Sequence, residues 1–208
     1  MAIDAGFTIT VWEESRGKSP LPPPPPNPSL TFSVIMRYPD FGPLLKNYMA
    51  SAELGLVVTC QGPVGEFGSD WFRHIVEGLP DVVVVLEHLA GADGEEEPPY
   101  EEFRSALELA ELPNTYIKVP GLGEISARPP VLGRLFGFGH KPPLFEMALE
   151  AFGAPRMMWG SDYPPVSNRE GYRNAFRGVL EHPALRNDED RDWVMGKTAL
   201  SVFGFPEG

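Results

Sequence analysis

The chain has 208 residues, a length that fits one ordinary domain, and 42% of them are hydrophobic, which is enough to build a core. Its 17 basic and 29 acidic residues give a net charge of −12, which repels phosphate backbones and anionic membrane faces, so we expect no nucleic-acid or membrane partner. No stretch is apolar over the roughly 18–20 residues that a membrane crossing requires, and the start lacks a basic leader, so we predict a cytoplasmic protein.

The N-terminal segment 1–30 is set apart by its proline content. Seven of the twelve residues from Ser19 to Leu30 are proline, including the run Pro22–Pro26. Proline fixes its own φ and donates no amide hydrogen bond, so this stretch is predicted to be an extended, solvated linker outside the core. We therefore place one folded domain at 31–208.

From residue 31 onward, short apolar runs alternate with amphipathic stretches, which is typical of strand–helix units around a parallel sheet. A helix is predicted at about 40–53, with Gly55 as its end. The run Val82–Leu86 is apolar at every position and must be covered on both faces, as a parallel strand is. The four predicted strands are Leu54–Thr59, Val82–Leu86, Thr115–Val119 and Arg156–Gly160.

Capping residues mark several of the helices between and after these strands. Ser69 predicts the start of a helix that Pro80 closes, and the last helix is predicted to begin near Asn187. Ser167 is followed three positions later by Glu170, the pattern of a capping box, which predicts another helix start at Ser167.

Polar side chains follow each predicted strand at its C-terminal end. Reactive groups of open parallel sheets and of barrels gather at this edge, so we expect these side chains to line one site. His88 comes directly after an apolar strand, which suits a general acid, a carbonyl-polarising donor or a metal ligand, although a structural histidine is the alternative. Asp162 is held between a glycine and a Pro-Pro pair, and a capping role in a turn is its alternative. The residues at the strand ends are Cys60, Gln61, Glu87, His88, Lys118, Glu124, Ser161, Asp162 and Tyr163.

Several segments stand in a specific order and spacing: Leu54-Gly-Leu-Val-Val, Val85-Leu-Glu-His-Leu-Ala-Gly91, Pro113-Asn-Thr-Tyr-Ile-Lys-Val-Pro-Gly121 and Phe152-Gly-Ala-Pro-Arg-Met-Met-Trp-Gly-Ser-Asp162. From about Phe41 to Phe205 the sequence resembles the C-terminal half of an amidohydrolase-related family of metal-dependent TIM-barrel hydrolases, which includes lactonases and decarboxylases. The resemblance implies an α/β fold that is part of a (β/α)8 barrel, strands 5–8 with their helices. A full barrel takes about 250 residues, so the N-terminal half is expected to be largely missing.

The resemblance also implies a reaction, the hydrolysis of small, carboxylated cyclic esters or amides. His88 would end the sixth strand and polarise the carbonyl or bind a metal, while Asp162 would end the eighth strand and bind the metal or activate water. The family's His-x-His pair has no counterpart, and the fifth-strand position reads Thr59-Cys60-Gln61, so we expect one weakly held divalent ion, Zn or Mn, or none. The predicted substrate contacts are Gln61, Lys118, Glu124 and Tyr163.

Some relatives of this kind work without metal and hold an acidic substrate with cations. Lys118, Arg128 and Arg169 are candidates for that role, and surface charge is the alternative for each. Two other functions stay open: decarboxylation of an aromatic acid, and an impaired partial barrel that acts as an interaction module. Because a partial barrel has open sheet edges, a homo-oligomer that covers them is a further prediction.

Overall fold

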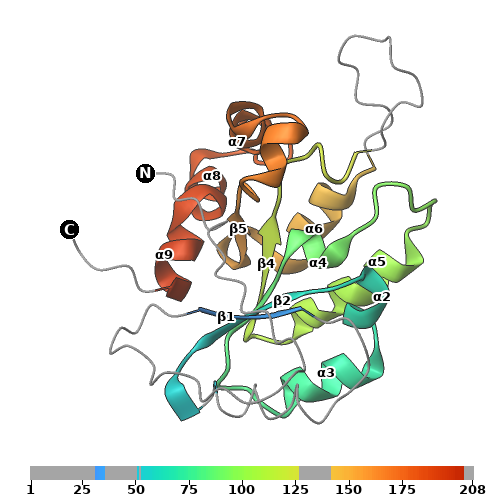
Figure 1. Cartoon of the computed structure of the whole chain (residues 1–208), viewed down its shortest axis with the longest axis vertical. Coiled ribbons are helices and arrows are strands. Elements are labelled where there is room, and N and C mark those ends of the chain that lie inside the picture. Colours follow the sequence, from blue (N-terminus) through green and yellow to red (C-terminus); the bar gives the residue numbers. More distant parts are fainter. Residues whose placement is uncertain (1–30, 36–50, 52, 127–141, 204–208) are drawn as a thin grey trace, which may run out of the picture.

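Five parallel strands form a single sheet in which neighbours in sequence are neighbours in space (Figure 1). The computed structural model describes residues 31–35, 51, 53–126 and 142–203. The predicted linker at 1–30, most of the helix predicted at 40–53, and Arg128 lie outside these residues. The strands are β1 (Thr31–Ile35), β2 (Val57–Gln61), β3 (Val84–Leu86), β4 (Thr115–Val119) and β5 (Met157–Trp159).

The four predicted strands are confirmed as β2 to β5, and β1 is a fifth that the sequence analysis missed. β1 pairs in parallel with β2, from Thr31 opposite Val57 to Ile35 opposite Gln61, and stands at one end of the strand order. Its sequence, TFSVI, alternates polar and apolar residues and spans only five positions. β2 begins later than predicted because Gly55, at φ +63°, still belongs to the end of the preceding helix.

Helices and short helical turns connect the strands, and none in the described part of the chain is both long and apolar enough to cross a membrane. The predicted caps at Ser69 and Asn187 are confirmed, since their side chains accept hydrogen bonds from the amides of Phe72 and Asp190 at 3.4 and 2.8 Å. The helices are α2 (Val64–Phe67), α3 (Asp70–Glu77), α4 (His88–Gly91), α5 (Glu101–Leu107), α6 (Leu144–Phe152), α7 (Tyr172–Leu180), α8 (Asp188–Asp192) and α9 (Thr198–Phe203).

The capping box predicted at Ser167 is wrong. Ser167 lies inside a 3-10 turn, Pro165–Asn168, and its amide donates to the carbonyl of Pro164, while α7 begins only at Tyr172. The Glu170 carboxylate instead accepts a hydrogen bond from the amide of Gly123, which is distant in sequence. A tertiary contact therefore replaces the local one that the pattern predicted.

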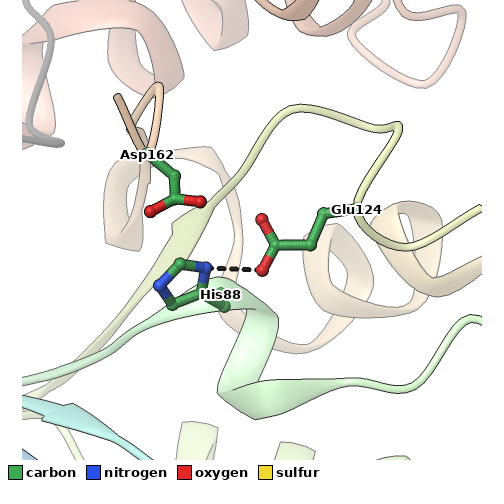
Figure 2. Close-up of side chains that lie close together, drawn as sticks. All are labelled: His88, Glu124 and Asp162. Atoms are coloured by element: carbon green, nitrogen blue, oxygen red, sulfur yellow. Dashed lines mark ion pairs between the residues drawn. The ribbon is translucent and has the colours of Figure 1, made fainter. Parts of the chain in front are cut away.

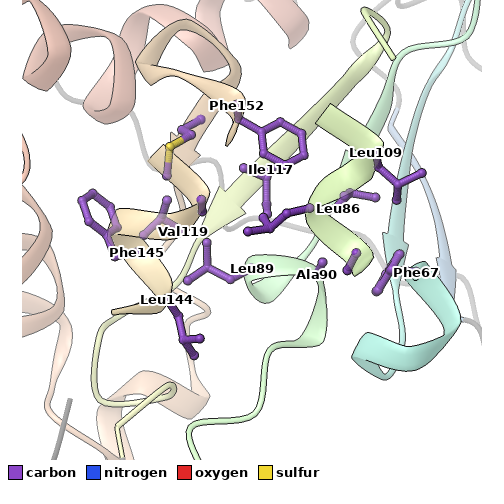
Figure 3. Packing of buried hydrophobic residues seen from close by; sticks show 14 of the residues in the cluster. Phe67, Leu86, Leu89, Ala90, Leu109, Ile117, Val119, Leu144, Phe145 and Phe152 are labelled. Carbon is purple, nitrogen blue, oxygen red and sulfur yellow. The ribbon is translucent and has the colours of Figure 1, made fainter. Parts of the chain in front are cut away.

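The two faces of the sheet bury different sets of side chains, because successive residues of a strand point to opposite sides. On one face Leu86, Ile117 and Val119 share a large core with Phe145 and Phe152 of α6 (Figure 3). The opposite face has a smaller cluster in which Val85 and Met158 pack with Ala199, and Val202 and Phe203, also of α9, lie against it. Since the strands are parallel, their C-terminal ends all open onto one edge of this doubly covered sheet.

Candidate functional site

Three polar side chains from three different loops converge at the C-terminal edge of the sheet (Figure 2). His88 follows β3, Glu124 follows β4 after a Gly-Leu-Gly turn, and Asp162 follows β5. One nitrogen or oxygen of each lies within 4.8 Å of one such atom of the others. The sequence analysis predicted that His88 and Asp162 share this edge. Glu124, predicted as a substrate contact, joins the same group.

The backbone that presents His88 is a single turn of left-handed helix. His88, Leu89, Ala90 and Gly91 have φ of +52°, +50°, +54° and +66°. A left-handed conformation costs a non-glycine residue roughly 1–2 kcal/mol and persists only where the surroundings fix it. Here Leu89 and Ala90 are fully buried, and a Cβ on Gly91 would collide with the carbonyl of Gly62. The turn is thus locked by packing, and the imidazole at its start is held in one place.

The His88 imidazole faces the Glu124 carboxylate across a very short distance. Nδ1 lies 2.6 Å from Oε1 (Figure 2). Burial alone lowers the pKa of His88, but the adjacent Glu124 and the charges of Glu87 and Asp162 outweigh it and raise the pKa above its usual value. Burial alone raises the pKa of Glu124, but contact with His88 and the charge of Arg169 hold that pKa below its usual range. The two groups therefore favour the imidazolium–carboxylate form.

Asp162 is the most water-exposed of the three and has the opposite tendency. Burial raises its pKa, and the neighbouring Glu124 raises it further, while the cations His88 and Arg169 only partly oppose this. Its backbone is also left-handed, with φ +52°. A carboxyl group with a raised pKa takes up and returns a proton more readily near neutral pH, which suits a general base or acid.

Arg169 bridges the two carboxylates of the group. Its Nη1 lies 2.6 Å from Glu124 Oε2 and 3.2 Å from Asp162 Oδ2, and its Nε is 3.5 Å from Glu170 Oε2. One guanidinium shared by two carboxylates reduces their mutual repulsion and allows both to be charged. The sequence analysis assigned Arg169 to a substrate, whereas the structure already pairs it with the carboxylates of the site.

The other predicted site residues are not members of this three-residue group. Gln61 is exposed at the end of β2, and the Tyr163 side chain is 60% exposed beside Asp162. Lys118 is buried, and its Nζ donates a hydrogen bond of 2.7 Å to Glu87 Oε1, with side chains only 5% and 8% exposed. Sequence reasoning missed this pair. The sequence does contain a signal for it, because Lys118 lies within one apolar strand and Glu87 directly follows the strand before it.

The three converging residues fit a divalent metal by donor type and number. A catalytic zinc is usually held by three protein ligands drawn from histidine, aspartate and glutamate. The buried His88 Nδ1 has no hydrogen bond of good geometry within the described residues, and Glu124 and Asp162 offer carboxylate oxygens beside it. The sequence analysis found two ligands, and Glu124 supplies the third that a stable site needs.

Comparison with known proteins identifies a sequence family and a shared fold. A sequence model described as amidohydrolase (Amidohydro_2) matches residues 17–205. An amidohydrolase from Burkholderia multivorans with bound zinc has a TM-score of 0.66 at 20% identity, over 79% of this chain and 58% of that one. A proposed 2-pyrone-4,6-dicarboxylic acid hydrolase from Pseudomonas putida has a TM-score of 0.64 at 19% identity, over 86% of this chain and 64% of that one.

Further comparisons define how far the likeness extends. A proposed hydrolase of the same substrate from Acinetobacter baumannii, with citric acid bound, has a TM-score of 0.61 at 16% identity, over 83% of this chain and 63% of that one. This chain thus spans 58% to 64% of these solved structures. At such identities the likeness shows the fold, and the predicted partial TIM barrel is confirmed. No match was found among curated proteins.

Proposed function

This chain belongs to the amidohydrolase family, and from that premise we propose that it hydrolyses small, carboxylated cyclic esters or amides. The observation that carries the proposal is the convergence of His88, Glu124 and Asp162 at the C-terminal edge of the sheet. Two proteins of similar fold are assigned to 2-pyrone-4,6-dicarboxylic acid, a cyclic ester with two carboxylates. We extend that substrate class, rather than that one compound, to this chain.

Asp162 is the proposed general base. Its carboxylate removes a proton from water as the water oxygen forms a bond to the carbonyl carbon of the substrate. When the ring C–O or C–N bond then breaks, the same carboxyl group returns the proton to the leaving oxygen or nitrogen. The raised pKa of Asp162 suits both steps, because a base with a pKa nearer the working pH transfers protons in both directions.

His88 is the proposed electrophile that stabilises the oxyanion. Since Nδ1 faces Glu124, the Nε2 side of the ring is turned away from that carboxylate and can donate a proton to the substrate oxygen. The Glu124 charge stabilises the imidazolium and orients it, as a carboxylate does for a catalytic histidine. A donor that is fixed before the reaction stabilises developing charge without reorganisation of its surroundings.

His88, Glu124 and Asp162 are also the residues that would hold a zinc or manganese ion. Such an ion, when bound, would supply Lewis-acid polarisation of the carbonyl and a lowered pKa of the attacking water. A metal ion would need a neutral His88, so it would compete with the proton that the ring shares with Glu124.

The substrate carboxylates require a local cation, because the chain as a whole carries a charge of −12. Arg169 is already paired with Glu124 and Asp162, so we propose that it offsets their negative charge beside the substrate rather than binding a substrate carboxylate as a free cation. Tyr163 and Gln61, both exposed near the strand ends, are proposed as polar contacts to the ring. Lys118 is assigned to support instead, since its ammonium is paired with the buried Glu87.

The proposal is tested by incubating the purified full chain, with and without added zinc or manganese, with 2-pyrone-4,6-dicarboxylate and with simpler carboxylated lactones and lactams. Ring opening is followed by ultraviolet absorbance and by acid release. We expect hydrolysis of at least one carboxylated ring, and a much slower reaction with the matched methyl ester. Release of carbon dioxide without consumption of water, or no reaction with any of these rings, would refute the proposal.

A further inference from the structure

We infer that Glu170 is a positioning residue that fixes Glu124 against His88 by packing its carboxylate on the Gly121–Gly123 turn, a role that rests on the function proposed above. Glu170 lies outside the group of three converging side chains. It contacts the loop that carries Glu124, from the segment that also carries Arg169. The sequence pattern predicted a capping box for Glu170, and the structure shows the contact with Gly123 in its place.

The contact between Glu170 and Gly123 is unusually close. The Glu170 side chain is only 4% exposed, and its Oε1 accepts a hydrogen bond of 3.3 Å from the amide of Gly123. A Cβ added to Gly123 would have the Glu170 carboxylate as all three of its nearest neighbours, with Cδ at 2.7 Å. Any side chain at position 123 would therefore displace this carboxylate.

Gly121 shows the same close approach at the other end of the turn. Its Cβ would collide with Glu170 Oε1 and would lie 2.8 Å from the Cβ of Ala175. Neither Gly121 nor Gly123 has a positive φ, so the backbone conformation of the turn does not itself require glycine. The Glu170 carboxylate therefore excludes a side chain at Gly123, and together with the Cβ of Ala175 it excludes one at Gly121.

The turn transmits this contact directly to Glu124. The amide of Glu124 donates 2.9 Å to the carbonyl of Gly121, which closes the turn on which Glu170 rests. The Glu124 carboxylate then lies 2.6 Å from His88 Nδ1 and 2.6 Å from Arg169 Nη1. Two adjacent residues therefore hold Glu124, Arg169 directly at its carboxylate and Glu170 through the amide of the preceding residue, Gly123.

Stability alone is a poor reason for this burial. Removing a carboxylate from water is unfavourable unless hydrogen bonds or ion pairs replace the lost hydration. Glu170 receives a hydrogen bond of 3.3 Å and an ion-pair contact of 3.5 Å from Arg169, and its buried Oε2 has no hydrogen-bond partner among the described residues. Charged groups that are buried with so few polar contacts are typical of functional sites, where an unfavourable arrangement is kept because it positions a side chain.

The test compares Gly123→Ala, Glu170→Ala and the double variant in the full chain. Loss of a residue that orients an active-site group typically costs about 10- to 100-fold in activity, and we expect each single variant to lose that much in kcat with a smaller change in KM. The double variant should lose no more than Glu170→Ala, because the added methyl group then meets no carboxylate. The control is Gly178→Ala, whose Cβ would make an ordinary 3.7 Å contact with Leu122, and its activity should not change.

A second readout does not depend on activity. Crystal structures of the wild type and of Glu170→Ala should show that the distance from His88 Nδ1 to Glu124 Oε1 increases beyond about 4 Å, the limit for an ion pair. This result decides the role of Glu170 even if every substrate tested with the wild type is inert, which would count against the proposed function only. If Glu170→Ala does not fold, Gly123→Ala, which retains Glu170, gives the same measurement. Glu124 still in contact with His88 in the variant would overturn the inference, and so, independently, would kcat/KM within about twofold of the wild type.

Discussion

Arg169 Nη1 lies 3.2 Å from Asp162 Oδ2, so a permanent cation stands next to the proposed general base. Burial and Glu124 raise the pKa of Asp162, and Arg169 opposes them. Arg169→Gln removes that opposition, so the pKa of Asp162 should rise further. A base must be deprotonated to act, so the acid limb of the kcat/KM profile should move to higher pH. The matched control is Arg177→Gln, which breaks an exposed pair with Glu181. A limb that stays in place, or moves to lower pH, contradicts the assignment of Asp162.

Asp162→Asn should abolish most turnover while the protein stays folded. The amide keeps the volume of the carboxyl group but cannot accept the proton of water, and loss of a general base costs about 10²- to 10⁴-fold in rate. Initial rates and thermal unfolding of the same preparation measure the two effects separately. Asp188→Asn, whose side chain is fully exposed, serves as the control and should match the wild type. Full activity in Asp162→Asn would remove this residue from the mechanism.

The contact between His88 and Glu124 makes stability depend on pH in a defined direction. The pKa of His88 is raised in the folded protein, so the stabilisation is fully present below its unfolded value of 6.5 and is lost as the pH rises through the higher folded value. Glu124→Gln removes the main group that raises this pKa, so the pKa of His88 should fall in the variant. Urea unfolding at a series of pH values should therefore show a loss of stability in the wild type as the pH rises above about 6.5, and a smaller loss in the variant. An identical pH dependence in both proteins would contradict the ion pair.

The buried pair of Lys118 and Glu87 is predicted to matter far more for stability than an exposed pair does. Lys118→Met leaves the Glu87 carboxylate buried without its partner, which should cost about 3–5 kcal/mol of unfolding free energy. Replacing both residues by methionine should recover much of that loss. Arg177→Met, which breaks an exposed pair with Glu181, is the control and should cost less than about 1 kcal/mol. Equal losses in the two single variants would show that Lys118 is not held as described.

The fold was predictable where burial leaves a local signal. The strand Val82–Leu86 is apolar throughout because both faces of β3 are covered, and its position was predicted from that pattern alone. β1 was missed because its sequence alternates polar and apolar residues over only five positions and its pairing with β2 is not local. Ser167 was assigned to a capping box because Glu170 follows it at the right spacing. The sequence does not show that the carboxylate of Glu170 instead accepts a hydrogen bond from the amide of Gly123.

The residues of the candidate site were predictable where they directly follow a strand whose end could be predicted. His88 and Asp162 closely follow apolar runs, and parallel strands bring such positions to one edge. Glu124 is separated from β4 by the Gly-Leu-Gly turn, and the path of that turn depends on Glu170, so its place beside His88 was not readable from the sequence. The partner of Lys118 likewise depends on how β3 and β4 lie beside each other, which fixes Glu87 as its neighbour.

The left-handed turn of α4 limits how this histidine could be transplanted into another scaffold. A peptide copied from His88 to Gly91 would relax to the more stable right-handed conformation, and the imidazole would then point elsewhere. The graft would also have to bring the Gly62 carbonyl that excludes any side chain at Gly91, and cavities in the recipient for Leu89 and Ala90. The smallest segment to transplant is therefore residues 57–91, which contains two strands, the helices between them and the left-handed turn.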